Sequence, residues 1–303
     1  MENRKFQQGA WHHIYAITQD GGVLFYRITD RLSFYTVASV FARRYNIIVL
    51  GLAIMFTHFH MMLRAIDLTQ LRTYMQQLLS TFARIIQEDR ALEGPVFKRP
   101  FGSAPKVSPK EQRSSIIYLY NNPVEKRLCT RAADDRWTFL RYAKETFPFS
   151  SKLVKRNVRY ALRTATDLVD REVSAGRYLR PALLRNLFQP LTREEQEQLT
   201  DYIIQRYQFI HHDEAIGRFD DYEAMLAACD ASSGKEFDVG EVFDSYSDTP
   251  YRDMAHMAAK AGLFEDWKLF HLDPGVRQKW LRTFRSACSA TELQARKFMH
   301  WFV

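Results

Sequence analysis

Two histidines separated by a single residue stand inside an apolar stretch of the sequence, from Ile54 to Leu63 (IMFTHFHMML). If this stretch is a β-strand, alternate side chains share a face, so the imidazoles of His58 and His60 point the same way. Their nitrogens would then lie about 6–7 Å apart, from a rise of roughly 3.3 Å per residue. Two neutral imidazoles on one rigid element can hold a divalent metal ion. The alternative is a core strand with two incidental histidines.

A tyrosine and an asparagine one helical turn apart form a second candidate pair. Residues 111–121 predict a helix, which Pro123 is expected to stop. Tyr118 and Asn122 are at positions i and i+4 and therefore share one face, whereas Tyr120 points elsewhere. On its own, this pattern also fits a packed aromatic residue followed by an asparagine cap.

Residues 94–111 predict a loop in which cations are mixed with aromatic rings. Its candidate contacts to a nucleic acid are Phe97, Lys98, Arg99, Phe101 and Lys106. Cations bind phosphates and rings stack on bases in proteins that hold single strands. The alternative is an ordinary basic loop whose aromatic residues anchor it to the core.

Positive charge is concentrated in the part of the chain that carries these candidates. Residues 1–150 hold 21 Lys and Arg against 12 Asp and Glu, whereas residues 213–250 hold 2 against 11. The formal net charge of the whole chain is +8. A basic half favours a polyanionic partner, and nucleic acid is the usual one. A merely basic surface is the alternative.

Composition narrows the class of protein. The 303 residues are 46% hydrophobic, enough for a packed core in one large domain or two ordinary ones. No apolar run approaches the roughly 20 residues of a membrane helix, and no apolar segment follows the charged N-terminus as in a signal peptide. Cys129, Cys229 and Cys288 are widely spaced and odd in number, so we expect neither disulfides nor a zinc site. These features favour a cytoplasmic protein that does not contact a membrane.

The candidate residues need a scaffold, and the first half of the chain predicts one. Strands are expected at Trp11–Thr18, Ile47–Met55 and around His58, and helices at 30–44 and 67–89. This β-α-β-β-α order suits an α+β sandwich with helices on one face of the sheet. Asp30 is the expected N-cap of the first helix. His12 and His13 fall in the first strand, point to opposite faces and are interpreted as structural.

Taken together, the motifs resemble a known family. They comprise the His-Phe-His strand, the Gly-Pro-Val-Phe segment at 94–97 and the helix YLYNNPV at 118–124. In this order and spacing they resemble the single-tyrosine HUH transposases, and most closely the REP-associated tyrosine transposase branch. The resemblance covers about residues 8–145 and also includes the run Leu50–Met55.

The resemblance implies a fold and a set of roles. Residues 1–146 would form an HUH catalytic domain with a ferredoxin-like antiparallel sheet. His58 and His60 would hold Mg²⁺ or Mn²⁺, Asn122 would be a third metal ligand, and Tyr118 would be the nucleophile. The implied partner is single-stranded or hairpin DNA. The family contains dimers as well as monomers, so a homodimer is one expected state.

The implied reaction is transfer of a DNA strand through a 5′-phosphotyrosine, with the metal ion stabilising charge on the phosphate. One departure is that Met55-Phe56-Thr57 stands where the family usually has Met-Pro-Asn. It motivates a second hypothesis, a sequence- or hairpin-specific DNA-binding protein with weakened or lost catalysis. A replication initiator or relaxase is a third hypothesis, which the short helix with a single nucleophilic tyrosine disfavours.

The second half, residues 147–303, predicts a mainly helical accessory region. Helical patterns fall at 150–174, 180–188, 194–207, 274–284 and 291–302. The acidic stretch 213–250 includes a turn-rich linker or insertion from residue 230, and the cluster His211–Glu214 is interpreted as a solvated turn. Ser289 is the expected cap of the last helix. The last two helices could belong to a helix-turn-helix that binds DNA, but packing on the first domain is the default interpretation.

Overall fold

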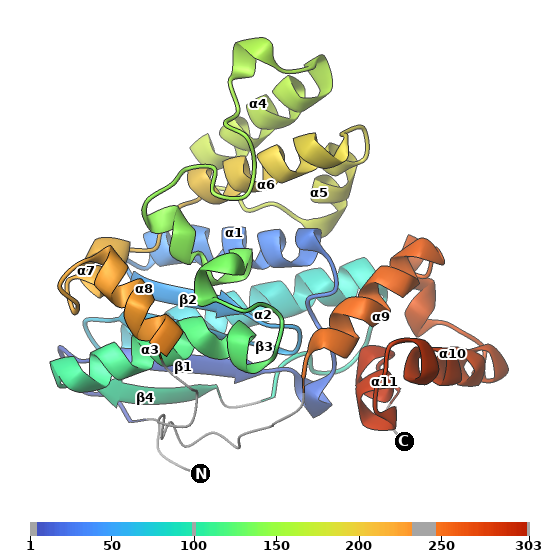
Figure 1. Ribbon diagram of the computed structural model, residues 1–303, viewed down its shortest axis with the longest axis horizontal. Helices are drawn as coiled ribbons and strands as arrows, with labels where there is room; N and C mark the ends of the chain where they lie inside the picture. Colours follow the sequence, from blue (N-terminus) through green and yellow to red (C-terminus); the bar gives the residue numbers. More distant parts are fainter. Residues whose placement is uncertain (1–4, 99–100, 232–246, 302–303) are drawn as a thin grey trace.

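The computed structural model describes residues 5–98, 101–231 and 247–301 of the chain. Its first half contains a four-stranded antiparallel sheet in the order β2-β3-β1-β4 (Figure 1). The strands are β1 (Trp11–Ile17), β2 (Ile48–Ile54), β3 (His58–Arg64) and β4 (Gly102–Lys106). Helix α1 (Ile28–Arg44) joins β1 to β2, and α2 (Leu68–Arg90) joins β3 to β4. This β-α-β-β-α-β arrangement is ferredoxin-like, which confirms the expected α+β class.

The two faces of the sheet differ because side chains alternate along each strand. On β3, Phe59 and Met61 point into a core that α1 and α2 close. The ring of Phe34 from α1 lies 4.6 Å from that of Phe59, measured between centroids. Helices α1 and α2 therefore cover one face, as expected, and His60 lies on the other.

Helix α3 (Pro109–Glu125) packs on the second face. The prediction that Pro123 stops this helix is wrong, since the helix continues for two residues beyond it. Pro123 has no N–H to offer the carbonyl of Leu119, four residues earlier. The Asn122 side chain compensates, because its Nδ2 donates to the carbonyl oxygens of Tyr118 and Leu119 at 3.0 and 3.4 Å.

Strand β4 lies within residues 94–111, which were expected to form a loop. Its sequence, GSAPK, lacks the β-branched and aromatic residues that mark strands. It pairs only with β1 at the edge of the sheet, where Pro105 is tolerated. Pairing with β1, rather than local propensity, therefore makes this segment a strand.

Asp30 is the third residue of α1 and not its N-cap. Its carboxylate accepts hydrogen bonds from the backbone N–H groups of Tyr26 and Arg27, both at 3.0 Å. It also forms a fully buried ion pair with Arg90 of α2 at 3.0 Å. Asp30 thus satisfies donors at the start of α1 and ties that helix to α2.

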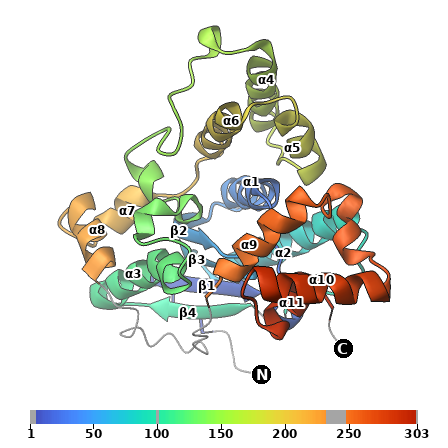
Figure 2. The same ribbon diagram turned by 45° about the vertical axis from the view of Figure 1, so that its right-hand side comes forward.

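The second half is mainly helical, as expected (Figures 1 and 2). Helices α5 and α6 pack on α1 and α4 packs on α6, while α8 packs on α3 and α9 packs with α11. The helices are α4 (Tyr160–Ser174), α5 (Pro181–Phe188), α6 (Arg193–Arg206), α7 (His212–Ile216), α8 (Tyr222–Ala231), α9 (Thr249–Lys260), α10 (Pro274–Ala287) and α11 (Glu292–Phe298).

Details of the second half differ from expectation. The helix expected from residue 150 begins at Tyr160, and the cap of α11 is Thr291 rather than Ser289. His212 was expected in a solvated turn but is buried at the start of α7. Residues 232–246, most of the expected linker, lie outside the described residues.

Apolar contacts cross the boundary expected between residues 146 and 147. One core cluster contains the sheet, α1 and α2 together with α4, α5 and α6. A second contains Tyr26 and Phe56 together with α9, α10 and α11, and the Tyr26 hydroxyl donates to the carbonyl of Phe298. The C-terminal helices thus pack on the first half. The division into domains 1–146 and 147–303 stays a prediction.

Two further features of the fold concern the state of the cysteines and the length of the helices. Cys129, Cys229 and Cys288 are all free. Burial raises the pKa of the Cys129 and Cys229 thiols to about 12, which disfavours the reactive thiolate. None of the described helices has the length and apolar character needed to span a membrane.

Candidate active site

Three histidines meet on the face of the sheet that α3 covers. His60 lies at the middle of β3, opposite Tyr15 of β1, and His13 lies two residues before Tyr15. His13 Nε2 is 3.1 Å from His60 Nδ1, and the two rings stack with centroids 5.2 Å apart. His58, at the start of β3, stands edge-on to His60 with centroids 4.9 Å apart.

His13, which was interpreted as structural, lies in this cluster and contacts His60. Alternation along the first strand shows only that His12 and His13 point to opposite faces. Which of them meets His60 depends on the register between β1 and β3, with His13 opposite Met62. The register between two strands cannot be read from the sequence alone. The sequence therefore could not show that the His13 imidazole lies beside His60.

Burial makes the imidazoles of His60 and His13 neutral. It lowers the pKa of His60 to about 3, against a smaller raising effect of its hydrogen bond with the Asn122 side chain, and Lys126 lowers it further. Burial also holds the pKa of His13 well below its usual value, with added repulsion from His60 and Lys106. A neutral imidazole is the form that ligates metal ions.

The positions of His58 and His60 fit two ligands of one cation. An imidazole nitrogen binds zinc at about 2.0–2.1 Å, which would place two ring centroids on one ion roughly 4.5–5.2 Å apart at bond angles of about 90–110°. The observed 4.9 Å lies in that range. Among the described residues, no group of three or more His, Cys, Asp or Glu side chains could hold a metal ion. An ion here would therefore need an amide, water or phosphate oxygen as well.

Helix α3 brings both of its candidate residues to the histidines. The Tyr118 ring is edge-on to His60 and to His13, with centroids 5.6 and 5.7 Å away. Asn122 is buried one turn later and hydrogen-bonds His60. The structure thus gathers Tyr118, Asn122, His58 and His60 in one place, although their metal and nucleophile roles stay predictions.

Tyr120 occupies a different environment from Tyr118. It is fully buried in the apolar cluster between α3 and β2, with its hydroxyl beside Gly51. A Cβ atom on Gly51 would lie only 3.3 Å from that hydroxyl oxygen, so the glycine permits the close approach. Burial raises the pKa of the Tyr120 phenol far above its usual value.

The loop residues proposed to bind nucleic acid divide into two groups. Phe97 and Phe101 are 6% and 7% exposed, so both rings are buried in the core and anchor the segment. Their burial disfavours stacking on bases, and a DNA-binding role for them stays a prediction. Lys98 is exposed, and Arg99 lies outside the described residues. Lys106 is on β4, close enough to lower the pKa of His13.

Thr57 stabilises the turn before His58 through its side chain and its backbone. Its hydroxyl is 3.0 Å from His58 Nδ1, and its carbonyl accepts a hydrogen bond from the Thr18 N–H at 3.0 Å. The carbonyl of Phe56 accepts from the N–H groups of Leu24 and Phe25. Although this turn lacks the Met-Pro-Asn sequence, its backbone is held by hydrogen bonds, and the Thr57 hydroxyl orients the His58 ring.

Comparisons with known proteins find little that is similar to this chain. No protein-family model matches the sequence, and no curated protein matches it. Among solved structures, a REP-associated tyrosine transposase bound to a REP hairpin has a TM-score of 0.38 and 15% sequence identity to this chain. That match covers 48% of this chain and 86% of the other. So distant a match says nothing about the chemistry here, which has to be inferred from the site itself.

Proposed function

We propose that this chain is a transposase-like strand transferase that cuts and rejoins single-stranded or hairpin DNA through a 5′-phosphotyrosine at Tyr118. The observation that carries the proposal is the meeting of Tyr118, Asn122, His58 and His60 on one face of the sheet. These residues come from two elements that are far apart in the sequence. The resemblance of their motifs to single-tyrosine HUH transposases supports the same roles.

In the proposed cleavage, the Tyr118 hydroxyl oxygen attacks a backbone phosphorus. A bond forms between this oxygen and phosphorus while the bond from phosphorus to the 3′ oxygen breaks. The phenol proton passes to solvent, and the departing oxygen takes up a proton to become a 3′-hydroxyl. Because the tyrosyl ester retains the energy of the phosphodiester, a 3′-hydroxyl can attack it in turn and rejoin a strand.

The side chains around Tyr118 suit a reaction at phosphate. Lys106 and Lys126 both act electrostatically on the histidine pair, which places two cations close to the site. A Mg²⁺ or Mn²⁺ ion held by His58, His60 and the Asn122 amide oxygen would polarise the scissile phosphate. His13 keeps His60 in place through its hydrogen bond.

A second candidate function is DNA binding without cleavage. Tyr118 is only 9% exposed, and Asn122 is hydrogen-bonded directly to His60. DNA and a cation would both have to displace these contacts before the phenol could react. A chain in which that opening does not occur would bind DNA and leave it intact.

The test compares two tyrosines on the same helix. Wild-type protein, Tyr118→Phe and Tyr120→Phe are each incubated with a 3′-labelled, hairpin-bearing single strand in Mg²⁺ or Mn²⁺. We expect a covalent protein–DNA band on a denaturing gel for the wild type and for Tyr120→Phe, and none for Tyr118→Phe. A band that persists in Tyr118→Phe would remove that residue from the role of nucleophile. Wild-type protein that shifts the DNA but never cuts it would favour the second function.

A further inference from the structure

A pocket lined by cations lies between α1, α5 and α9, apart from the histidine cluster, and has a volume of about 640 Å³. We call it the arginine pocket. Its cationic lining is formed by Arg27, Arg31, Arg185 and Arg252, and His256 lies beside them. Its aromatic lining is formed by Tyr26, Phe56, Phe188 and Phe264. No Asp or Glu among the described residues lines it.

Several hydrogen-bond donors in the wall of the arginine pocket have no partner within the described part of the protein. Thr29 and Arg31 are 7% and 8% exposed, and Thr29 Oγ1 and Arg31 Nε make no hydrogen bond there. The same holds for Nε and Nη2 of Arg27. Buried polar atoms are normally satisfied, so these donors match a ligand that is rich in acceptor oxygens.

The start of helix α1 contributes to the same wall. Arg27, Ile28 and Thr29, which line the pocket, are the N-cap and the first two residues of this 17-residue helix. The first N–H groups of a helix have no partners within it, and the helix dipole adds partial positive charge at this end. The Asp30 carboxylate already accepts from the Arg27 N–H at this end, so a further anion would be held mainly by the unpartnered side-chain donors.

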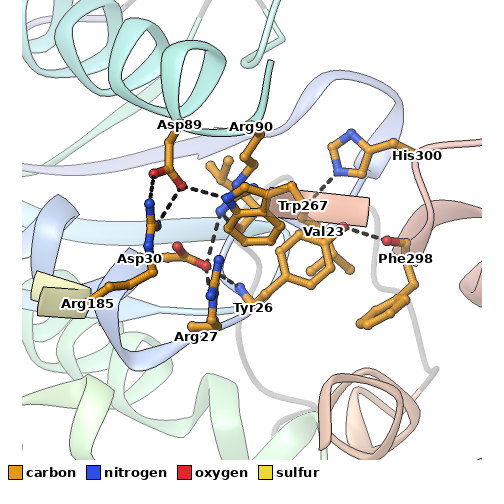
Figure 3. A network of polar contacts seen from close by, with 11 residues as sticks. Val23, Tyr26, Arg27, Asp30, Asp89, Arg90, Arg185, Trp267, Phe298 and His300 are labelled. Carbon is orange, nitrogen blue, oxygen red and sulfur yellow. Dashed lines mark hydrogen bonds and ion pairs between the residues drawn. The ribbon is translucent and has the colours of Figure 1, made fainter. Parts of the chain in front are cut away.

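Acidic residues beside the pocket form ion pairs with arginines, some of which line it, and Figure 3 shows two of these pairs. Asp30 is paired with Arg90, and both side chains are fully buried. Asp89 is paired with Arg185 and accepts a hydrogen bond from Trp267 Nε1 at 2.8 Å. The Arg27 guanidinium instead lies over the Trp267 ring, 4.1 Å from its centroid. Asp89 therefore offsets the charge of Arg185, and Asp253 forms an ion pair with Arg252, so the pocket arginines that have unpartnered donors are Arg27 and Arg31.

We propose that the arginine pocket binds the phosphate group of a nucleotide, either within a DNA strand or as a free nucleotide. The guanidinium groups of Arg27 and Arg31 and the start of α1 would hold the phosphate. Phe56 of the pocket is two residues before His58, so their Cα atoms are at most about 7 Å apart. The pocket and the histidines are thus neighbours along the chain, although α1 and His60 lie on opposite faces of the sheet. This binding goes beyond the proposed strand transfer, because it needs neither Tyr118 nor a metal ion.

The test measures binding in EDTA, so that it does not depend on cleavage. Fluorescence anisotropy follows a labelled decathymidylate, and thymidine 5′-monophosphate is added as competitor in a second arm. Arg27→Gln removes two of the unpartnered donors, and Thr29→Val removes a hydroxyl while keeping the shape of the side chain. Arg171→Gln, which changes an exposed arginine on α4, is the control for the loss of one charge.

We expect Arg27→Gln to weaken binding about tenfold or more and to lower its salt dependence, Thr29→Val to weaken it several-fold, and Arg171→Gln to change it less than twofold. Thr29→Val should melt no lower than the wild type, because the lost hydroxyl has no partner. If the decathymidylate responds to the variants, the ligand is a strand. If only the monophosphate responds, it is a free nucleotide. Unchanged affinity of Thr29→Val for both ligands in a folded protein would overturn the proposal.

Discussion

The contact between His13 and His60 decides how the second of these histidines can act. His60 Nδ1 is engaged by His13 Nε2 at 3.1 Å, so a cation would have to bind the other ring nitrogen and would compete with the hydrogen bond between His60 and Asn122. Both rings are kept neutral by burial. Histidines that bind metal ions commonly use one nitrogen for the ion and the other for a neighbour that fixes the ring. His13 is thus a positioning residue in the proposed site.

Metal binding should depend on His13 but not on its neighbour His12. We expect His60→Ala to abolish binding of Mn²⁺ and His13→Asn to weaken it about 10–100-fold, the usual cost of losing such a neighbour. His12→Asn is the matched control, because His12 is also buried in β1 but lies on the opposite face. Isothermal titration with Mn²⁺ measures all three. Equal losses for His12→Asn and His13→Asn would show that the effect is general destabilisation.

At the scale of elements, Asn122 supports the length of α3 and also carries one of the roles proposed for the site. Pro123 withholds one backbone donor from the helix, and the Asn122 amide N–H group serves the carbonyls of Tyr118 and Leu119 instead. With its Nδ2 used in this way, the amide oxygen of Asn122 is left to act towards His60 or a cation. One side chain therefore connects the shape of the helix to the chemistry of the site.

These two roles of Asn122 can be separated by a pair of substitutions. Asn122→Ala should lower the free energy of unfolding by about 1–3 kcal/mol, because buried carbonyls lose their donor. Adding Pro123→Ala should recover part of that loss, since residue 123 then has an N–H for the Leu119 carbonyl. Urea denaturation measures this change, and titration with Mn²⁺ should show no recovery of metal binding. A double variant no more stable than Asn122→Ala would contradict the role assigned to the Asn122 amide.

The elements also show what the sequence could and could not reveal. The strands carrying His13 and His60, and helices α1 and α2, follow from the spacing of apolar residues. Strand β4 could not be found in that way, because its residues are poor strand formers that pair only through β1. Likewise, the sequence suggests that Phe97 and Phe101 are exposed rings in a basic loop, but both side chains are buried in the core. Register and burial depend on the whole fold, whereas local patterns reveal only the elements.

At the scale of the whole molecule, the C-terminal helices α9, α10 and α11 share an apolar core with residues of the first half. The His300 ring is partly buried, and its Nε2 lies 2.6 Å from the carbonyl oxygen of Val23 in the connection before α1. Burial lowers the pKa of His300 to about 4, against a smaller raising effect of this hydrogen bond, and that of His212 also falls to about 4. Both histidines are therefore neutral in the folded protein at pH 5.

Stability should consequently fall as the pH is lowered from 7 to 5. In the unfolded chain a histidine has a pKa of about 6.5, so between about pH 6.5 and 4 the unfolded state takes up protons that the folded state does not. The stabilisation present above pH 6.5 is lost as the pH falls through this window. Melting temperatures at pH 7 and 5 measure the effect. His300→Gln should reduce the difference between them, with His212 keeping part of it, and an unchanged difference would rule out His300 as a contributor.

Mass spectrometry of the covalent adduct locates the nucleophile. Trypsin should release residues 114–126, which contain both Tyr118 and Tyr120, as one peptide. After reaction with single-stranded hairpin DNA in Mn²⁺ and digestion of the DNA, we predict that this peptide carries a nucleotide and that fragment ions place it on Tyr118. A nucleotide on Tyr120, or on a peptide from elsewhere in the chain, would contradict the proposed site.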